Sequence, residues 1–294
     1  MTARLLAAAA LVAGLLATPA TSRAWCRMTT SSSAPTPGSP CVTEGIPLEW
    51  RRRCIEYSID GRGSKDLALD DVRSIVRASF DAWLTIDCPD GRPPFEVRET
   101  EQHAICDRAE YNQENGNVNT VAFVTDWDDR EYDPAAYALT TVWHNTRTGE
   151  IYDADMEINE QRGTYGVCPD VDGCTDGTID LRNVLTHEAG HFFGLGHTQP
   201  VHSFAVMYAV SPPGEVGKRI PRSDDIEGFC AIYPAGSLPD DCNFTPRHGL
   251  DLNCTDDEGC GCSAPGAPRD PSAPLALLCI AILSAVLRRS SKRP

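Results

Sequence analysis

The sequence is poor in positive charge. Its 294 residues include 26 lysines and arginines but 42 aspartates and glutamates, which gives a formal net charge of −16. Proteins that bind nucleic acid neutralise phosphates with lysine and arginine, so this balance argues against a nucleic acid partner. The sequence also has no internal repeat, and no apolar run reaches the about 20 residues that a stable membrane span needs. The apolar fraction of 41% is ordinary for a globular protein, and we expect a monomer.

The two longest apolar runs lie at the ends of the chain. Residues 5–16 follow the positive Arg4 and precede Ser22 and Ala24, small residues at the positions that a signal peptidase favours, an order typical of a secretory signal peptide over residues 1–24. Residues 275–287 are followed by a cluster of basic residues, which would stay cytoplasmic by the positive-inside rule. We therefore expect an exported protein, secreted or displayed at the cell surface, with transient membrane attachment through its C-terminal segment. A short N-terminal membrane anchor is the alternative interpretation of the first run.

Cysteine is abundant, with 13 residues. A reduced cytosolic enzyme of this size rarely has so many, and together with an export signal they indicate disulfides. Six cysteines fall between residues 48 and 235, which allows three bridges among them: Cys54, Cys88, Cys106, Cys168, Cys174 and Cys230. We expect Cys168 and Cys174 to pair because the short loop between them can close on itself. Metal ligation is the competing interpretation of these cysteines.

The most informative stretch is residues 187–197, which reads H-E-x-x-H-x-x-G-x-x-H. His187 and His191 are four residues apart, so a helix places both imidazoles on one face, where they can bind one metal ion. Glu188 is next to a ligand without being one, and it is placed to accept a proton from metal-bound water. A chance H-E-x-x-H in an ordinary helix is the alternative interpretation.

The residues after this helix strengthen the metal interpretation. His197 is six residues beyond His191, so a continuing helix would carry it away from the metal. Gly194 is the residue best able to take the left-handed conformation that turns the chain back. A third histidine completes three protein ligands and leaves one position open for water, as in catalytic zinc sites. Met207 follows ten residues later.

Hydrophobic periodicity predicts several strands and two long helices. The helices cover residues 67–86 and about 180–194, and a third helix begins at Ser223. Strands are expected at residues 53–60, 95–97, 120–125, 138–143 and 150–158. This pattern is typical of a mixed domain with one sheet flanked by helices.

Three further segments lack this periodicity. Residues 25–47 are expected to be a linker, unstructured over the Ser-, Thr- and Pro-rich residues 28–40. Residues 236–262 are expected to be a Cys- and Asp-rich tail that is either cross-linked by disulfides or loosely attached. Before the histidine helix, a Gly-containing loop has three carboxylates that suit either calcium or a solvated acidic surface: Asp170, Asp172 and Asp176.

Several segments around the histidines resemble a matrixin, the metzincin group that contains the matrix metalloproteinases. The likeness is carried by residues 180–186, which read D-L-R-N-V-L-T, by 205–208, which read A-V-M-Y, and by 223–228, which read S-D-D-I-E-G. Thr198 follows the third histidine where matrixins usually have Ser, astacins Glu and reprolysins Asp. The resemblance covers approximately residues 48–235.

This resemblance implies a fold and a reaction. We expect an α+β metzincin (zincin-like) catalytic domain with a mixed twisted sheet and an active-site helix followed by a Met-turn. His187, His191 and His197 would bind one catalytic zinc, Glu188 would be the general base, and Met207 would be an apolar floor rather than a ligand.

The resemblance also implies further site residues. One of Asp224 and Asp225 would be a buried structural carboxylate. A polypeptide substrate would pair with an edge strand and a neighbouring pocket, through Ala138, Leu139, Thr140 and Tyr208. Calcium ligands would lie near the sheet, at Asp153, Asp155 and Glu157.

The sequence departs from the animal enzymes of this family. Their second, structural zinc uses three histidines and an aspartate, whereas the comparable strands here have Thr140 and Tyr152, and residues 126–128 replace a histidine-containing loop. We therefore expect one zinc, with calcium the better candidate for a further structural ion. The Cys-containing latency motif and haemopexin-like repeats are also missing. Cys26 and Cys41 are expected to form ordinary disulfides rather than to cover the zinc.

The C-terminal end resembles a MYXO-CTERM sorting signal. Residues 259–263 read G-C-G-C-S and are followed by a spacer of small residues, the apolar run and the basic end. The resemblance implies a bacterial protein that is processed near these cysteines and displayed on a myxobacterial cell surface or released. The sorting segment would cover residues 263–294, and a plain C-terminal membrane anchor is the alternative.

Together these features predict an exported zinc endopeptidase that hydrolyses polypeptides with water activated by zinc and with Glu188 as the general base. The first alternative is a surface adhesion or structural protein on a metzincin scaffold that has lost catalysis. Such proteins usually lose the glutamate or a histidine, and all four residues are present here. The second alternative is another metzincin family such as the astacins, whose tyrosine two residues after the Met-turn methionine is replaced here by Ala209.

Overall fold

The structure of the chain is a computed structural model that describes residues 25–31 and 40–254. The expected signal peptide (1–24), the middle of the expected linker (32–39) and the expected sorting segment (263–294) lie outside the described residues, as does the end of the tail. Within the described residues, no helix is both long enough and apolar enough to cross a membrane.

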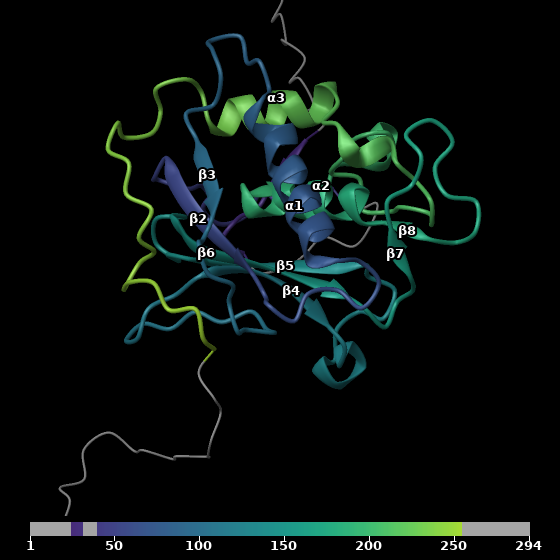
Figure 1. Ribbon diagram of the computed structural model, residues 1–294. Helices are drawn as coiled ribbons and strands as arrows, with labels where there is room; N and C mark the ends of the chain where they lie inside the picture. Colours follow the sequence, from purple (N-terminus) through teal and green to yellow (C-terminus); the bar gives the residue numbers. More distant parts are fainter. Residues whose placement is uncertain (1–24, 32–39, 255–294) are drawn as a thin grey trace, which may run out of the picture. The chain divides into compact units, whose positions relative to one another are not determined.

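A five-stranded mixed sheet forms the centre of the domain (Figure 1). Its strands are β2 (Cys54–Ile59), β3 (Glu96–Glu99), β4 (Asn119–Val124), β5 (Ala138–His144) and β6 (Ile151–Asn159). They lie in the order β3-β2-β4-β6-β5, and all neighbours are parallel except β5, which pairs antiparallel with β6 at one edge. The five strands expected from periodicity are therefore confirmed.

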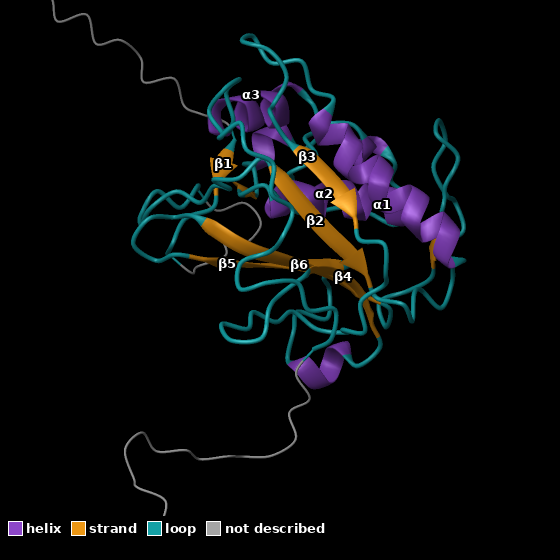
Figure 2. Ribbon diagram, turned by 60° about the vertical axis from the view of Figure 1, so that its left-hand side comes forward, coloured by secondary structure: helices purple, strands orange, loops and turns teal. Residues whose placement is uncertain are grey.

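Two helices cover one face of this sheet (Figure 2). They are α1 (Leu69–Leu84) and α2 (Leu181–Phe192), and Phe80 of α1 lies edge-on to Phe192 of α2 with ring centroids 5.1 Å apart. The apolar stripe expected on α1 is buried, which includes Val72, Ile75, Val76, Phe80 and Trp83. Burial of each such side chain contributes about 1.5–3 kcal/mol, so this stripe anchors α1 to the sheet and to α2.

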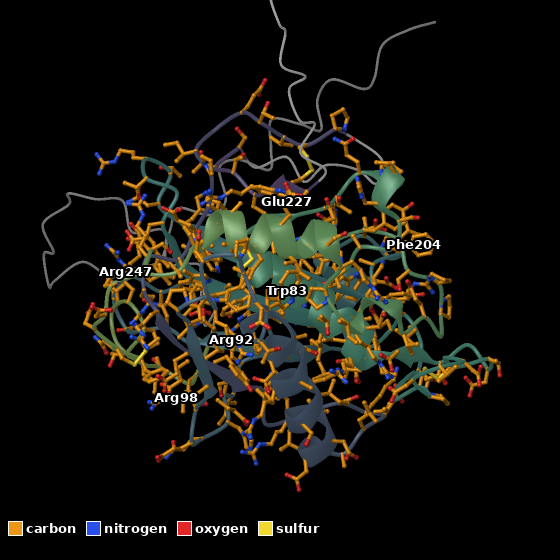
Figure 3. The ribbon with its side chains drawn as sticks, turned by 90° about the horizontal axis from the view of Figure 1, so that it is seen from above. Trp83, Arg92, Arg98, Phe204, Glu227 and Arg247 are labelled. Atoms are coloured by element: carbon orange, nitrogen blue, oxygen red, sulfur yellow. A yellow bond between two sulfur atoms is a disulfide. The ribbon has the colours of Figure 1, made fainter. Side chains whose placement is uncertain are left out.

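A third helix, α3 (Ser223–Ile232), packs against the C-terminal end of α1 and begins at Ser223 as predicted. Phe229 contacts Trp83 with ring centroids 5.4 Å apart. In Figure 3, Trp83 and Glu227 lie on opposite sides of α3, the first in the core and the second at the surface. The helix therefore presents one face to the site described below and the other to solvent.

The N-terminal segment packs onto the domain. β1 (Cys26–Arg27) pairs antiparallel with β9 (Leu195–Gly196), and a disulfide joins Cys26 to Cys41. The prediction of an unstructured stretch over residues 28–40 is wrong at its start, because Met28 donates its backbone N–H to the Gly194 carbonyl oxygen at 2.9 Å and Thr30 donates to that of Ile46 at 2.8 Å. The disulfide itself confirms that these cysteines do not cover the histidines. The other short elements are β7 (Tyr165–Gly166), β8 (Ile179–Asp180), η1 (Trp127–Arg130), η2 (Pro200–His202) and η3 (Gly217–Arg219).

Loops cover the other face of the sheet (Figure 2). The disulfides Cys54–Cys242 and Cys106–Cys254 tie the tail to β2 and to the loop before β4. The three bridges that the six cysteines between residues 48 and 235 allow are therefore not all formed among them, because the tail supplies the partners of Cys54 and Cys106. The other four pair as Cys88–Cys230 and, as predicted, Cys168–Cys174.

Candidate metal centre and active site

Helix α2 carries the first two histidines of the motif. Asp180 caps its N-terminus by accepting the backbone N–H of Asn183 at 2.8 Å. After the helix ends, Gly194 adopts a left-handed backbone with φ of 86° and turns the chain back into β9. A Cβ atom at Gly194 would lie 2.9 Å from the Leu48 carbonyl oxygen, so glycine is required at this turn. The returning chain places His197 beside the helix, as the spacing predicts.

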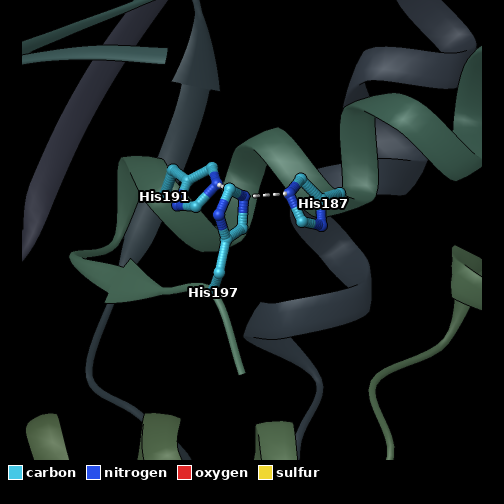
Figure 4. A group of neighbouring side chains, drawn as sticks. All are labelled: His187, His191 and His197. Carbon is cyan, nitrogen blue, oxygen red and sulfur yellow. Dashed lines mark hydrogen bonds between the residues drawn. The ribbon is translucent and has the colours of Figure 1, made fainter. Parts of the chain in front are cut away.

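The three imidazoles converge on one point (Figure 4). Nε2 of His197 lies 3.2 Å from Nε2 of His187 and 3.1 Å from Nε2 of His191. Ligand atoms arranged tetrahedrally around zinc, at about 2.0–2.1 Å from it, are about 3.3 Å from one another. The observed separations are close to this value.

Hydrogen bonds to Nδ1 determine the tautomer of His187 and His191, and therefore whether Nε2 points a lone pair at the point where the three rings converge. Nδ1 of His187 lies 2.6 Å from the Val206 carbonyl oxygen, and Nδ1 of His191 lies 2.8 Å from that of Leu195. A carbonyl oxygen only accepts, so both Nδ1 atoms carry the proton and both Nε2 atoms have lone pairs. Nε2 of His197 carries at most one proton, so it can donate a hydrogen bond to only one of these two lone pairs. A metal cation can instead accept a lone pair from each of the three rings. The residues therefore fit a metal ion, and three histidines suit zinc.

His187 is kept neutral by its surroundings. Burial lowers the pKa of His187 well below its ordinary value, and the charges of His191, His197 and Lys218 lower it further. The neutral imidazole is the form that binds a metal, so the site is prepared for one near neutral pH.

Glu188 lies beside the histidines with 5% of its surface exposed. Its Oε2 atom accepts a hydrogen bond from the Thr140 hydroxyl at 2.6 Å. Burial raises the pKa of Glu188 above its ordinary value, while the charge of His191 and the Thr140 hydrogen bond partly offset this shift. A raised pKa makes a carboxylate a better proton acceptor near neutral pH, which suits the role of general base.

Met207 lies beneath α2, with 2% of its surface exposed. A Cβ atom at Gly190 would lie 2.1 Å from Sδ of Met207 and 2.9 Å from Cζ2 of Trp83. Glycine at this position therefore lets the helix rest directly on the methionine. The Thr198 N–H donates to the Met207 carbonyl oxygen at 2.9 Å, which joins the third-histidine segment to the same turn.

Two carboxylates in the first turn of α3 hold this arrangement together. Asp225 accepts the backbone N–H of Val206 at 2.8 Å and that of Met207 at 3.0 Å. Asp224 accepts the Thr198 hydroxyl at 2.6 Å. The resemblance to matrixins implied one buried structural carboxylate, whereas both are buried and each holds a different segment of the site.

The predicted substrate residues lie at the edge of the sheet and after the Met-turn. Ala138, Leu139 and Thr140 begin β5, where Leu139 is exposed and Thr140 is buried against Glu188. Tyr208 directly follows the Met-turn methionine and is half-buried. The structure thus brings Thr140 into the site itself and places the others around it.

Two buried cations next to the site, Lys218 and Arg219, were not predicted from the sequence. Lys218 Nζ donates to the carbonyl oxygens of Tyr208 and Val210, each at 2.6 Å, and so holds the segment after the Met-turn. Arg219 forms an ion pair with Asp180 at the start of α2. No local pattern marks these residues, because the partners named here lie 8, 10 and 39 residues away in the sequence.

Three predicted calcium ligands lie on the face of β6 opposite the helices. Asp155 accepts two backbone N–H groups, one of them from Thr120 at 2.7 Å. Glu157 accepts from Arg130 at 2.7 Å, so it already has a cationic partner. Asp153 has no hydrogen-bond partner at either oxygen, and burial raises the pKa of Asp153 to about 8.

The other three predicted calcium ligands lie in the loop before α2. Asp170 pairs with Arg219, whereas Asp172 and Asp176 are exposed. Over the described ranges, no three of the six carboxylates come within ligand distance of a single ion. Calcium binding therefore stays a prediction without a ligand set.

The fold and this site define a metzincin, with a mixed sheet, a helix bearing two histidines, a glycine turn to the third and a methionine beneath. The family model for matrixins, peptidase M10, matches residues 49–234, and the chain belongs to this family. The resemblance of residues 48–235 to a matrixin is thereby confirmed.

Two plant proteins are among the chain's relatives. It is 25% identical over 189 residues to Metalloendoproteinase 1-MMP of Arabidopsis thaliana, a match that covers 63% of this chain and 44% of the plant protein. It is also 25% identical over 209 residues to Metalloendoproteinase 4-MMP of the same plant, covering 71% of this chain and 51% of that protein. The chain thus spans about half the length of these relatives.

Proposed function

We propose that this protein is an exported zinc-dependent endopeptidase with one catalytic zinc. The observation that carries the proposal is the convergence of the Nε2 atoms of His187, His191 and His197 beside the buried carboxylate of Glu188. Membership of the matrixin family and the names of the two plant relatives support the same reaction class.

When bound by the three histidines, zinc supplies a Lewis acid that polarises the scissile carbonyl and makes water more acidic. Glu188 accepts a proton from the attacking water and later delivers it to the amine leaving group. The carbonyl oxygens of Val206 and Leu195 keep two imidazoles in the tautomer and orientation that ligation requires. Met207 is buried beneath α2, where it lies against Gly190 between the first two histidines in the sequence.

Residues 138–140, at the start of strand β5, are the proposed docking edge for a polypeptide substrate. In the part of the chain that the structure describes, β5 pairs only with β6, so its outer edge has backbone donors and acceptors without a strand partner. An extended peptide can add to such an edge by main-chain hydrogen bonds. Because Thr140 in this strand contacts Glu188, a peptide paired along residues 138–140 passes close to the base.

Export and surface display are part of the proposal. Five disulfides within the described residues are typical of an oxidising compartment outside the cytoplasm. The apolar C-terminal run at residues 275–287 would provide transient membrane attachment. We take the enzyme to be a monomer.

Digestion of casein or gelatin by the purified protein tests the proposal. We expect cleavage that stops when a chelator removes the metal and returns when one equivalent of zinc is added. Calcium added alone to the chelated protein should not restore it. The proposal is wrong if the zinc-loaded protein leaves casein, gelatin and a peptide library uncut.

A further inference from the structure

We propose that Thr140 is a positioning residue for Glu188, and that its hydroxyl holds one carboxylate oxygen so that the other is left to exchange protons with water and substrate. This inference rests on the proposed function. The Thr140 Oγ1 atom lies 2.6 Å from Oε2 of Glu188, and both residues are buried, with 8% and 5% of their surfaces exposed. Such a short contact between a hydroxyl and a carboxylate is a strong, charge-assisted hydrogen bond.

Strand geometry explains why Thr140 reaches the base. Side chains alternate along β5, so Ala138, Thr140 and Val142 face the helices, and Ala138 and Val142 pack against the main core. Thr140 pairs with Met156 of β6, which is 2% exposed, so its backbone is fixed within the sheet. Its β-branched side chain has few rotamers, which makes the hydroxyl a rigid donor.

Glu188 depends on this donor for its orientation. Among the described residues, Thr140 is the one side chain that donates a hydrogen bond to the Glu188 carboxylate. The hydroxyl also lies 3.3 Å from the Glu188 backbone carbonyl oxygen, but its single proton goes to the closer carboxylate. A glutamate side chain without this contact would sample several rotamers and would face the reacting carbonyl only part of the time.

The contact also links substrate binding to catalysis. The strand that offers its edge to a peptide is the strand that holds the base, so the register of the bound peptide and the position of Glu188 share one rigid support. A substrate paired along residues 138–140 is thereby delivered at a defined distance from the carboxylate.

Three single variants separate this role from general packing. Thr140→Val keeps the shape of the side chain and removes only the hydroxyl, whereas Thr140→Ser keeps the hydroxyl. Thr141→Val is the matched control, because Thr141 is the next residue in the same strand and faces the opposite side of the sheet. With zinc-loaded protein and a peptide substrate, we expect T140V to lower kcat by about tenfold with KM changed less than about twofold. T140S and T141V should retain kcat within about threefold of the wild type.

A second measurement does not depend on activity. In crystal structures of the zinc-free proteins, Glu188 should occupy one rotamer in the wild type, T140S and T141V, and more than one in T140V. The inference is overturned if T140V has wild-type kcat, or if its Glu188 keeps the wild-type rotamer. It is also overturned if T140S loses as much activity as T140V. A wild-type protein that does not cleave peptides refutes the proposed function, and the Glu188 rotamers then still decide whether Thr140 positions the carboxylate.

Discussion

Replacing Asp225 by alanine tests how the Met-turn is held. Asp225 is fully buried at the start of α3 and accepts three backbone N–H groups, from Val206 at 2.8 Å, Met207 at 3.0 Å and Arg222 at 2.8 Å. Val206 in turn accepts from Nδ1 of His187 through its carbonyl oxygen. One carboxylate thus fixes the Met-turn, the entry to α3 and, through Val206, the orientation of a metal ligand.

The size of the effect follows from these contacts. Each buried donor left without an acceptor costs about 1–3 kcal/mol, so three donors give about 3–9 kcal/mol. Two terms reduce this cost. Burial raises the pKa of Asp225, so removing the carboxylate relieves part of a desolvation penalty, and water can reach the N–H of the exposed Arg222. We expect Asp225→Ala to lower the free energy of unfolding by about 3 kcal/mol, a large part of the 5–15 kcal/mol typical of a domain.

Urea denaturation of the zinc-free protein measures this loss. Glu227→Ala is the control, because Glu227 lies on the exposed side of the same helix and should change stability by less than about 0.5 kcal/mol. A competition titration with a chromogenic chelator should also show zinc affinity about tenfold to a hundredfold weaker in D225A, since a group that orients a ligand is lost. If D225A unfolds at the same urea concentration as E227A, the carboxylate does not hold the Met-turn as we describe.

Two further predictions concern packing and pH. Gly190→Ala should cost about 1–2 kcal/mol in urea unfolding, because overpacking against Met207 outweighs the gain of about 1 kcal/mol in helix propensity. Gly217→Ala is its control, since a Cβ atom there meets its nearest atom at 3.5 Å, and equal stability of the two variants would contradict the packing account. Burial raises the pKa of Asp153 to about 8, so the folded protein binds this proton more tightly than the unfolded chain does. The contribution of Asp153 to the free energy of unfolding therefore falls as pH rises from about 4 to about 8, by at most about 1.4 kcal/mol per pH unit. The stability of Asp153→Asn relative to the wild type should therefore grow over this range in chelator-containing buffer and level off above it, and a difference that is constant with pH would refute the assignment.

Local patterns predicted a large part of this structure. Ligands four residues apart, a glycine at the turn and a third histidine lie within residues 187–197, so their spacing alone indicates a metal centre. The five strands and the helices also follow from periodicity, because each buries one face against a common core. The family assignment rests on the same segments and is confirmed over residues 49–234.

Contacts between distant segments could not be predicted in this way. Thr140 and Glu188 are 48 residues apart, and the cysteines of the Cys54–Cys242 disulfide are separated by 188 residues. Such pairs depend on how the sheet, the helices and the tail pack, which no local pattern records. Lys218 illustrates the same limit, because a lysine is rarely buried and its carbonyl partners carry no sequence signature. The start of the stretch expected to be unstructured was misjudged, because its Ser-, Thr- and Pro-rich composition gives no sign of the backbone hydrogen bonds that Met28 and Thr30 form with distant residues.

The central claim is that three histidines hold one zinc ion while Glu188 handles the proton. The most direct test is to measure zinc content and peptide cleavage together in the wild type and in Glu188→Gln. The account predicts one zinc per chain, bound with similar affinity in both proteins, and cleavage by E188Q that is reduced by about 10²–10⁴-fold or lost. Cleavage by E188Q at the wild-type rate, with zinc still bound, would contradict it.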